Sequence, residues 1–322
     1  MSKRPSDGRD GGRTAELRRP HLYLVFDDWS RGYSVRKVDL SGSDSGDGGD
    51  RPLQQAVLSG EVTKPRLVFR LEAPHGLPHC FASAFGTSIM NLHPRKPITD
   101  QRHKMPEGLY PILDVHSRGI FFGPRPESDS VCPIYIPSGD MLFALASGSL
   151  EMLSSPPEPI GHNCLWSWCK LENPPFERQE VTSYAVHPGG PTILVSTVTG
   201  DTEVTYALDM KKVPCMWTSL GNWRLPFTGF GHFDVRLNAY VGLSNDPNTL
   251  GHLCSCDALS SDVVDGRCLA PAQKLSKERL FSVNDPAEVH MGATLVYLGR
   301  RRFCLVQCIG LDDDFDQLQE KE

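Results

Sequence analysis

The sequence predicts an all-β fold and, within that class, a β-propeller of about six blades. Its 322 residues include 29 glycines and 26 prolines, which lie between short apolar runs and so indicate many short strands. A helical repeat of 3.6 residues is not sustained anywhere in the chain. A strand–turn–strand pattern instead recurs about every 50 residues, a period typical of propeller blades.

Six segments have the composition of a β-hairpin, with β-branched and aromatic residues on both sides of a turn. They are residues 22–38, 81–92, 131–146, 182–198, 230–243 and 293–308. Their turn positions are separated by 54, 53, 51, 48 and 62 residues and fall at Gly32, Gly86, Gly139, Gly190, Asn238 and Arg300. This spacing predicts one repeated unit rather than six unrelated hairpins.

A single blade cannot cover both of its faces, whereas blades stacked around an axis cover one another. The apolar run 22–26 is predicted to add a strand beside residues 293–306, which would close the ring. Six blades fit the hairpins best, and five or seven remain alternatives.

The chain is predicted to hold one propeller domain, residues 21–310, with polar segments around and within it. Residues 1–20 are charged and rich in glycine, as in disordered segments. Residues 41–51 are predicted to form a flexible acidic loop, and residues 311–322 an acidic tail.

Charge and hydropathy restrict the partners and the compartment. The net charge, 33 − 39 = −6, provides no field that would attract nucleic acid or an anionic membrane. No run approaches the ~20 apolar residues of a membrane span, and the first residues lack the apolar core of a signal peptide. The ten cysteines are interpreted as reduced thiols, so we expect a cytoplasmic or nuclear protein.

One group of residues has the chemistry of a metal site: His252, Cys254, Cys256 and Cys268. The first three alternate along a strand and would share one face. Their spacing matches no standard zinc knuckle, so buried core cysteines are the preferred interpretation. We therefore predict no metal and no cofactor.

Signatures of catalysis are absent from the sequence, since it contains no nucleophile elbow, metalloprotease pair, Walker loop or Rossmann glycine run. Asp27 and Asp28 would point to opposite faces of a strand and cannot act as a pair. Three further acids, Glu151, Asp209 and Asp234, have no partner visible in the sequence. The histidines are scattered, at positions that include His75, His79, His93, His103, His116, His162, His187, His232 and His290. No catalytic residue is predicted.

Two kinds of side chain leave binding open. The tryptophans are best explained by packing between blades, with exposed hot spots for a partner as the alternative; they are Trp29, Trp166, Trp168, Trp217 and Trp223. The run Arg300-Arg301-Arg302 is interpreted as a solvated hairpin tip, with an anion site as the alternative.

Residues 206–209, Trp217 and residues 225–227 together resemble a degenerate kelch half-repeat, with a tyrosine and an aspartate before a tryptophan and a proline. The double glycine Gly189-Gly190 lies in a hairpin, as in kelch repeats.

The chain also resembles a large family of plant proteins, expanded in grasses, that is known only as a domain of unknown function. The resemblance is carried by HLYLVFDDWSRGYSV, YAVHPGGPTILVS and HMGATLVYLGRRRFCLVQC, and it covers residues 21–309. It implies a kelch-like propeller and no particular activity. No F-box helix precedes the repeats, so a ubiquitin-ligase adaptor is not expected.

Two functions follow as hypotheses. The first is a non-catalytic, monomeric interaction module that binds a protein or peptide through its loops. The second is a propeller-based enzyme that acts on a sugar or small molecule, like galactose oxidase or a glycan-processing enzyme.

Overall fold

The computed structural model describes residues 21–40, 65–73, 78, 80–92, 109–128, 133–157, 166–187, 192–259, 263–264, 267–282 and 288–311. Within these residues the regular structure consists of strands and three short 3-10 helices, with no α-helix, so the predicted all-β class is confirmed. The chain divides into two compact units, Met1–Leu77 and Pro78–Glu322.

The first unit contains an antiparallel sheet of three strands, β1 (His21–Asp27), β2 (Tyr33–Asp39) and β3 (Arg66–Leu71), paired in chain order. The β1–β2 turn holds a 3-10 helix, η1 (Trp29–Arg31), and then Gly32. A Cβ at Gly32 would lie 2.1 Å from the Leu71 carbonyl oxygen, and its φ is +80°, so this turn requires glycine.

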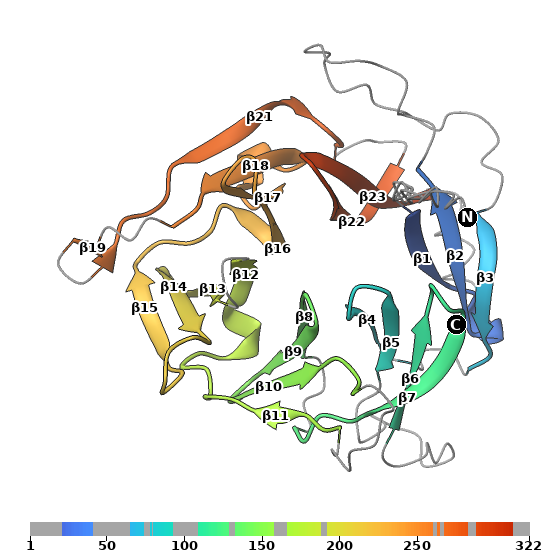
Figure 1. Ribbon diagram of the computed structural model, residues 1–322. Coiled ribbons are helices and arrows are strands. Elements are labelled where there is room, and N and C mark those ends of the chain that lie inside the picture. Colours follow the sequence, from blue (N-terminus) through green and yellow to red (C-terminus); the bar gives the residue numbers. More distant parts are fainter. Residues whose placement is uncertain are drawn as a thin grey trace, which may run out of the picture. The chain divides into compact units, whose positions relative to one another are not determined.

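The second unit begins with two antiparallel sheets of four strands each (Figure 1). The first sheet contains β4 (Cys80–Ala84), β5 (Ser88–Leu92), β6 (Leu109–Asp114) and β7 (Gly119–Pro124). The next sheet contains β8 (Ile134–Ser138), β9 (Met141–Ala146), β10 (Ser149–Ser154) and β11 (Cys169–Lys170). In both sheets each strand pairs with the next one along the chain, as expected for a blade.

An eight-stranded sheet follows, in which two four-stranded meanders are joined by a parallel pair between β12 and β16. The first meander has β12 (Val181–His187), β13 (Thr192–Thr199), β14 (Thr202–Asp209) and β15 (Trp217–Gly221). The other has β16 (Phe227–Asp234), β17 (Ala239–Ser244), β18 (His252–Asp257) and β21 (Gln273–Arg279). Shorter elements are η3 (Arg178–Glu180), η4 (Pro247–Thr249), β19 (Val263–Val264) and β20 (Arg267–Cys268).

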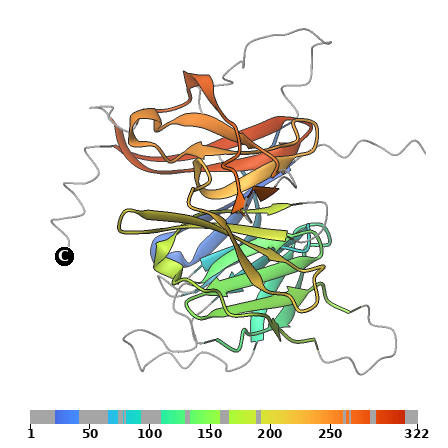
Figure 2. The ribbon, with the colours of Figure 1, turned by 90° about the vertical axis from the view of Figure 1, so that its left-hand side faces the viewer.

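A long hairpin of β22 (Glu288–Gly299) and β23 (Arg302–Leu311) ends the described chain. Within the second unit, β22 lies beside β16 and β17, as both ribbon views show (Figure 1 and Figure 2). Because these strands are neighbours, the β22–β23 turn lies next to the β16–β17 turn.

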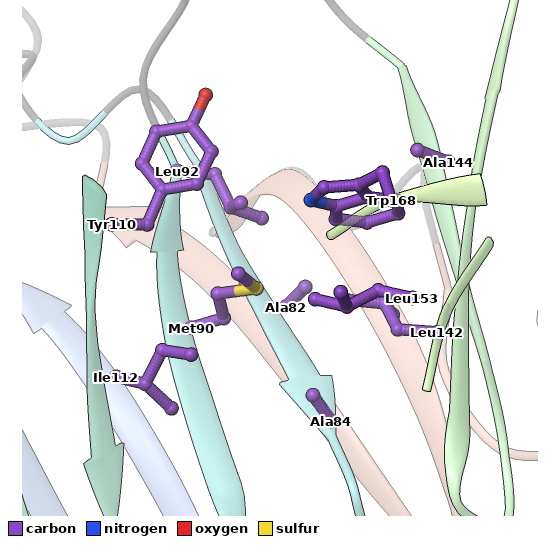
Figure 3. Close-up of a cluster of buried hydrophobic side chains, with 10 residues drawn as sticks. All are labelled: Ala82, Ala84, Met90, Leu92, Tyr110, Ile112, Leu142, Ala144, Leu153 and Trp168. Carbon is purple, nitrogen blue, oxygen red and sulfur yellow. The ribbon is translucent and has the colours of Figure 1, made fainter. Parts of the chain in front are cut away.

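The apolar core of the second unit lies between successive meanders. Figure 3 shows one cluster, in which Ala82 and Met90 of the β4–β7 sheet lie toward Leu142 and Leu153 of the β8–β11 sheet. A further cluster joins β8–β10 to β12–β14, and a third joins β13 to β16–β18. Each meander therefore covers an apolar face of its neighbour, and removing that surface from water stabilises the stack.

The six predicted hairpins are confirmed as the pairs β1–β2, β4–β5, β8–β9, β12–β13, β16–β17 and β22–β23. Five of the six predicted turn positions have positive φ, namely Gly32, Gly86, Gly139, Asn238 and Arg300. The sixth, Gly190, lies outside the described residues, as do residues 1–20, 41–51 and 312–322. Ring closure, the blade count and the limits of a single propeller domain stay predictions.

Candidate functional site

Aspartates end several strands and fix the turns that follow them. Asp27, Asp114 and Asp234 each accept a hydrogen bond from the backbone N–H two residues later, at 2.8, 2.9 and 2.8 Å. Asp209 does the same with Lys211, at 3.0 Å. A short carboxylate side chain reaches this N–H without strain, which is why aspartate favours turn entrances.

Asp234 differs from the other turn aspartates because its carboxylate holds two turns. The Oδ1 atom accepts from the backbone N–H of Arg236 and of Leu237, at 2.8 and 2.9 Å. The Oδ2 atom accepts from the Tyr297 hydroxyl at 2.9 Å and from the Arg301 backbone N–H at 2.7 Å. Asp234 is fully buried. We call the two turns that it joins, residues 234–238 and 299–302, the double-turn surface.

The electrostatics of this clamp favour an ionised carboxylate. Burial would raise the pKa of Asp234, but its four hydrogen bonds outweigh burial and hold the pKa below the ordinary value. The pKa of Tyr297 is raised, first by burial and then by the hydrogen bond to Asp234. Near neutral pH the carboxylate is therefore a charged acceptor and the phenol a neutral donor.

The β22–β23 turn has an unusual backbone for its sequence. Gly299 pairs with Arg302, so Arg300 and Arg301 form a two-residue turn, with φ of +54° and +62°. Such turns favour Asn-Gly, because a β-carbon makes positive φ unfavourable. The hydrogen bond from the Arg301 N–H to Asp234 helps to hold the strained backbone. Turn geometry alone does not account for two arginines here.

The double-turn surface presents positive charge beside apolar side chains. Val235 is 72% exposed and Leu237 is 44% exposed. Arg236, Arg300, Arg301 and Arg302 are exposed as well. Within the described residues, no ion pair is seen for Arg236, Arg300 or Arg301.

Beneath this surface, His232 connects β16 to β22. Its Nε2 atom lies 2.7 Å from the Leu295 carbonyl oxygen, so the neutral ring donates from Nε2. The rings of Phe230, Tyr297 and Phe303 surround it, with centroids 4.8, 6.3 and 6.4 Å away. Burial lowers the pKa of His232, and the hydrogen bond to Leu295 offsets this only in part. This histidine is therefore a neutral packing residue at pH 7.

The candidate metal ligands are not brought together as a site. The described residues hold no group of three or more side chains suited to a metal ion. His252 Nδ1 lies 3.0 Å from the Ser276 carbonyl oxygen, and the Cys254 thiol donates to the Pro226 carbonyl oxygen at 3.2 Å. Burial raises the pKa of both Cys254 and Cys256 to about 12, which opposes the thiolate that a metal requires. Both are buried core residues, as the preferred interpretation of the sequence predicts.

Four of the five tryptophans pack as the sequence predicts. Each donates its indole N–H to the backbone carbonyl of a residue distant in sequence: Trp166 to Ser154, Trp168 to Pro124, Trp217 to Glu172 and Trp223 to Cys268. Trp29 differs, because it lies in the β1–β2 turn of the first unit, is 64% exposed and has a φ of +57°. Trp29 thus fits the exposed alternative.

Glu151 has partners that sequence inspection did not reveal. Its two carboxylate oxygens accept from the backbone N–H groups of Glu127 and Ser128, both at 2.7 Å. An aspartate just before a turn is a signal that could have identified the local half of the Asp234 clamp. No local signal marks the partners of Glu151, or Tyr297 and Arg301 as partners of Asp234.

Of the remaining described candidates, His187 and His290 pack against aromatic rings, and His116 donates its backbone N–H to Asp114. His187 packs 5.1 Å from the Phe233 ring, and burial lowers its pKa. His290 stacks on Phe281 at 4.8 Å. Five candidates, His75, His79, His93, His103 and His162, lie outside the described residues.

A small hollow of about 260 Å³ is lined by Asp201, Thr202, Glu203 and Asn222. Of its two acids, Glu203 is paired with Arg224 at 3.0 Å. In the described part of the chain, no helix is long and apolar enough to cross a membrane.

Comparisons with known proteins identify a family without assigning an activity. Residues 19–322 match the model of a family described as "Protein of unknown function (DUF1668)". Among curated proteins, none matches the sequence significantly.

Solved structures resemble the chain only distantly. TolB from Acinetobacter baumannii is 13% identical, with a TM-score of 0.43 over 81% of this chain and 55% of TolB, so the chain spans about half of that protein. A candidate 6-phosphogluconolactonase from Bacteroides fragilis is 11% identical, with a TM-score of 0.40 over 90% of this chain and 81% of the other chain.

Proposed function

The chain belongs to the DUF1668 family of proteins of unknown function, and we propose that it is a non-catalytic scaffold that binds a protein partner through its hairpin turns. We take the scaffold to be a kelch-like β-propeller of about six blades. Six hairpins at nearly regular spacing and core clusters between successive meanders support this architecture. We also propose that the protein is a monomer and lies in the cytosol or nucleus, as the sequence predicts.

The observation that carries the proposal is the double-turn surface. A buried carboxylate clamps two turns that are 63 to 67 residues apart in the sequence. Arginines and aliphatic side chains of the same turns are exposed. Arginine is enriched at protein interfaces, and rigid turns lose little entropy on binding.

Backbone strain in other turns supports a binding role for the hairpin ends. Six non-glycine residues of the described chain have positive φ, and all six lie in hairpin turns: Trp29, Phe85, Arg118, Asn238, Arg300 and Arg301. Residues held in unfavourable conformations gather at functional sites, because the surrounding structure maintains them for another purpose.

The buried acid of the double-turn surface, Asp234, is poorly suited to catalysis. Asp234 already accepts four hydrogen bonds, three of them from backbone N–H groups, and its lowered pKa makes it a weak base. The chemistry of this surface therefore favours recognition over a reaction.

Proximity labelling in cells that express the protein tests the proposal. Three forms of the full chain are compared: the wild type, Arg236→Glu/Arg300→Glu, and Lys274→Glu/Lys277→Glu. The lysine variant is the matched control, because it changes the net charge equally on the exposed strand β21. We expect one reproducible partner set for the wild type and the control, which the arginine variant loses. Identical partner sets for all three forms would overturn a role for this surface.

A further inference from the structure

The geometry points to a specific class of partner: we propose that the double-turn surface binds an acidic linear peptide with an apolar side chain among its carboxylates. This inference rests on the proposed function and adds the chemistry of the partner. It follows from the charge of the surface, its exposed aliphatic side chains and its rigidity.

Charge is the first argument. The backbone N–H groups of Arg236 and Arg301 bind the two oxygens of one carboxylate, at 2.8 and 2.7 Å, so these arginines lie close together. Arg300 precedes Arg301 in the turn. The acid that joins the two turns, Asp234, is buried, and its hydrogen bonds come from backbone N–H groups and a phenol rather than from guanidinium groups. Arginine binds carboxylates in a planar, often bidentate geometry, which suits an acidic peptide.

Apolar exposure is the second argument. Val235 and Leu237 stand on either side of Arg236 in the β16–β17 turn, and they are 72% and 44% exposed. An aliphatic pair beside arginines matches a peptide in which one apolar residue is flanked by acids. Nucleic acid would leave this aliphatic pair without an apolar partner, so the exposed pair favours a peptide.

Rigidity is the third argument. Asp234 ties both turns to buried strands, and the Tyr297 ring packs 5.2 Å from Phe303 below them. A surface that is already ordered avoids much of the entropy loss of binding, so a short peptide can suffice as a ligand.

An acidic segment with an apolar residue also occurs in this chain, as Asp312-Asp313-Asp314-Phe315-Asp316. The sequence of this segment supplies a convenient probe.

Fluorescence anisotropy with labelled synthetic peptides tests the proposal. The probe has the sequence of residues 312–318, DDDFDQL. One comparison peptide replaces each aspartate by asparagine, and another replaces Phe and Leu by serine. Each is titrated with the full-length wild type, with Arg236→Glu/Arg300→Glu, with Val235→Ser/Leu237→Ser and with the control Lys274→Glu/Lys277→Glu. Circular dichroism and thermal melting show that each variant is folded.

We expect saturable binding of the acidic probe to the wild type and the lysine control. Binding should weaken at least tenfold for the arginine variant and for the uncharged peptide. The serine peptide should bind several-fold more weakly to the wild type, and the Val235→Ser/Leu237→Ser variant should not distinguish it from the probe.

Equal binding to the arginine and lysine variants, or no saturable binding of the probe, would overturn the proposal. Self-association that persists after Asp312, Asp313, Asp314 and Asp316 are replaced by asparagine, and that disappears in the arginine variant, would also overturn it, since the occupant would then be another surface of a second copy. The probe could fail to bind while the set of labelled partners still depends on the arginines. In that case the preference for an acidic peptide is wrong, but the proposed function as a protein-binding scaffold stands.

Discussion

Two buried carboxylates of the second unit, Asp234 and Glu151, both bind backbone N–H groups, but they differ in how far along the chain their partners lie. Asp234 is fully buried and Glu151 is 2% exposed, and both accept hydrogen bonds from backbone N–H groups. Glu151 holds residues only 23 and 24 positions away, whereas Asp234 also holds residues 63 and 67 positions away. Both anchor the chain, and within the described residues neither carboxylate accepts a hydrogen bond from a guanidinium group. Anchoring by itself therefore does not account for the exposed arginines in the two turns that Asp234 joins.

Removing the Asp234 carboxylate should have the largest effect. Asp234→Ala leaves the Tyr297 hydroxyl and three backbone N–H groups without their acceptor, so we expect a loss of about 3–4 kcal/mol in the free energy of unfolding. Urea denaturation measures it. A loss below about 1 kcal/mol would show that the clamp is not needed.

Glu151→Ala should cost less, about 2–3 kcal/mol, because two backbone N–H groups lose their acceptor. It should leave the response to the acidic peptide unchanged, since the double-turn surface is intact. The same denaturation and anisotropy measurements apply. Asp234→Ala, by contrast, should weaken peptide binding, because Asp234 holds the two turns of the double-turn surface together. An equal loss of peptide affinity in both variants would contradict this difference between Glu151 and Asp234.

Tyr297→Phe isolates one hydrogen bond of the clamp. The ring contact with Phe303 is retained while the hydroxyl donor to Asp234 is lost, so the expected destabilisation is about 1 kcal/mol. Thermal melting next to Phe303→Leu, which removes the ring partner but keeps the hydrogen bond, separates packing from hydrogen bonding. No change in Tyr297→Phe would mean that the phenol contributes nothing to the clamp.

Replacing Arg300-Arg301 by Asn-Gly should stabilise the hairpin by up to about 1 kcal/mol, because these residues adopt positive φ more readily. The same change should weaken binding of the acidic peptide. A variant that is more stable and still binds fully would remove the argument that the arginines are present for recognition.

The pH response should show the smallest effect. Burial lowers the pKa of His232, so the folded state holds fewer protons than the unfolded state, and stability should decline as pH falls below about 6.5. His232→Gln, which keeps a donor for the Leu295 carbonyl, should reduce this slope between pH 7 and 5. The lowered pKa of Asp234 acts at lower pH, because its contribution is lost only as the carboxylate becomes protonated below about 4. An unchanged slope in His232→Gln would assign the acid response to other groups, such as His187.

Only part of the candidate site can be predicted from residues that are neighbours in the sequence. Asp234 precedes a turn, and aspartates at such positions commonly accept the N–H two residues on, so this half of the clamp follows from the local sequence. The hairpin tip predicted at Arg300 to Arg302 is confirmed. The hydrogen bond from the Arg301 N–H to Asp234 was not predictable, because it joins residues 67 positions apart and no local sequence pattern marks such a pair.

The hairpins and the all-β class were determined by local composition, because alternation of apolar residues and turn chemistry act over a few neighbours. The partners of Asp234 and Glu151, the carbonyl groups that accept from the tryptophans, and the parallel junction of β12 with β16 were decided only when the sheets packed. Those contacts depend on which strand ends meet in space. Which strand ends meet depends on the total apolar surface that whole meanders bury against one another, and no single residue determines it.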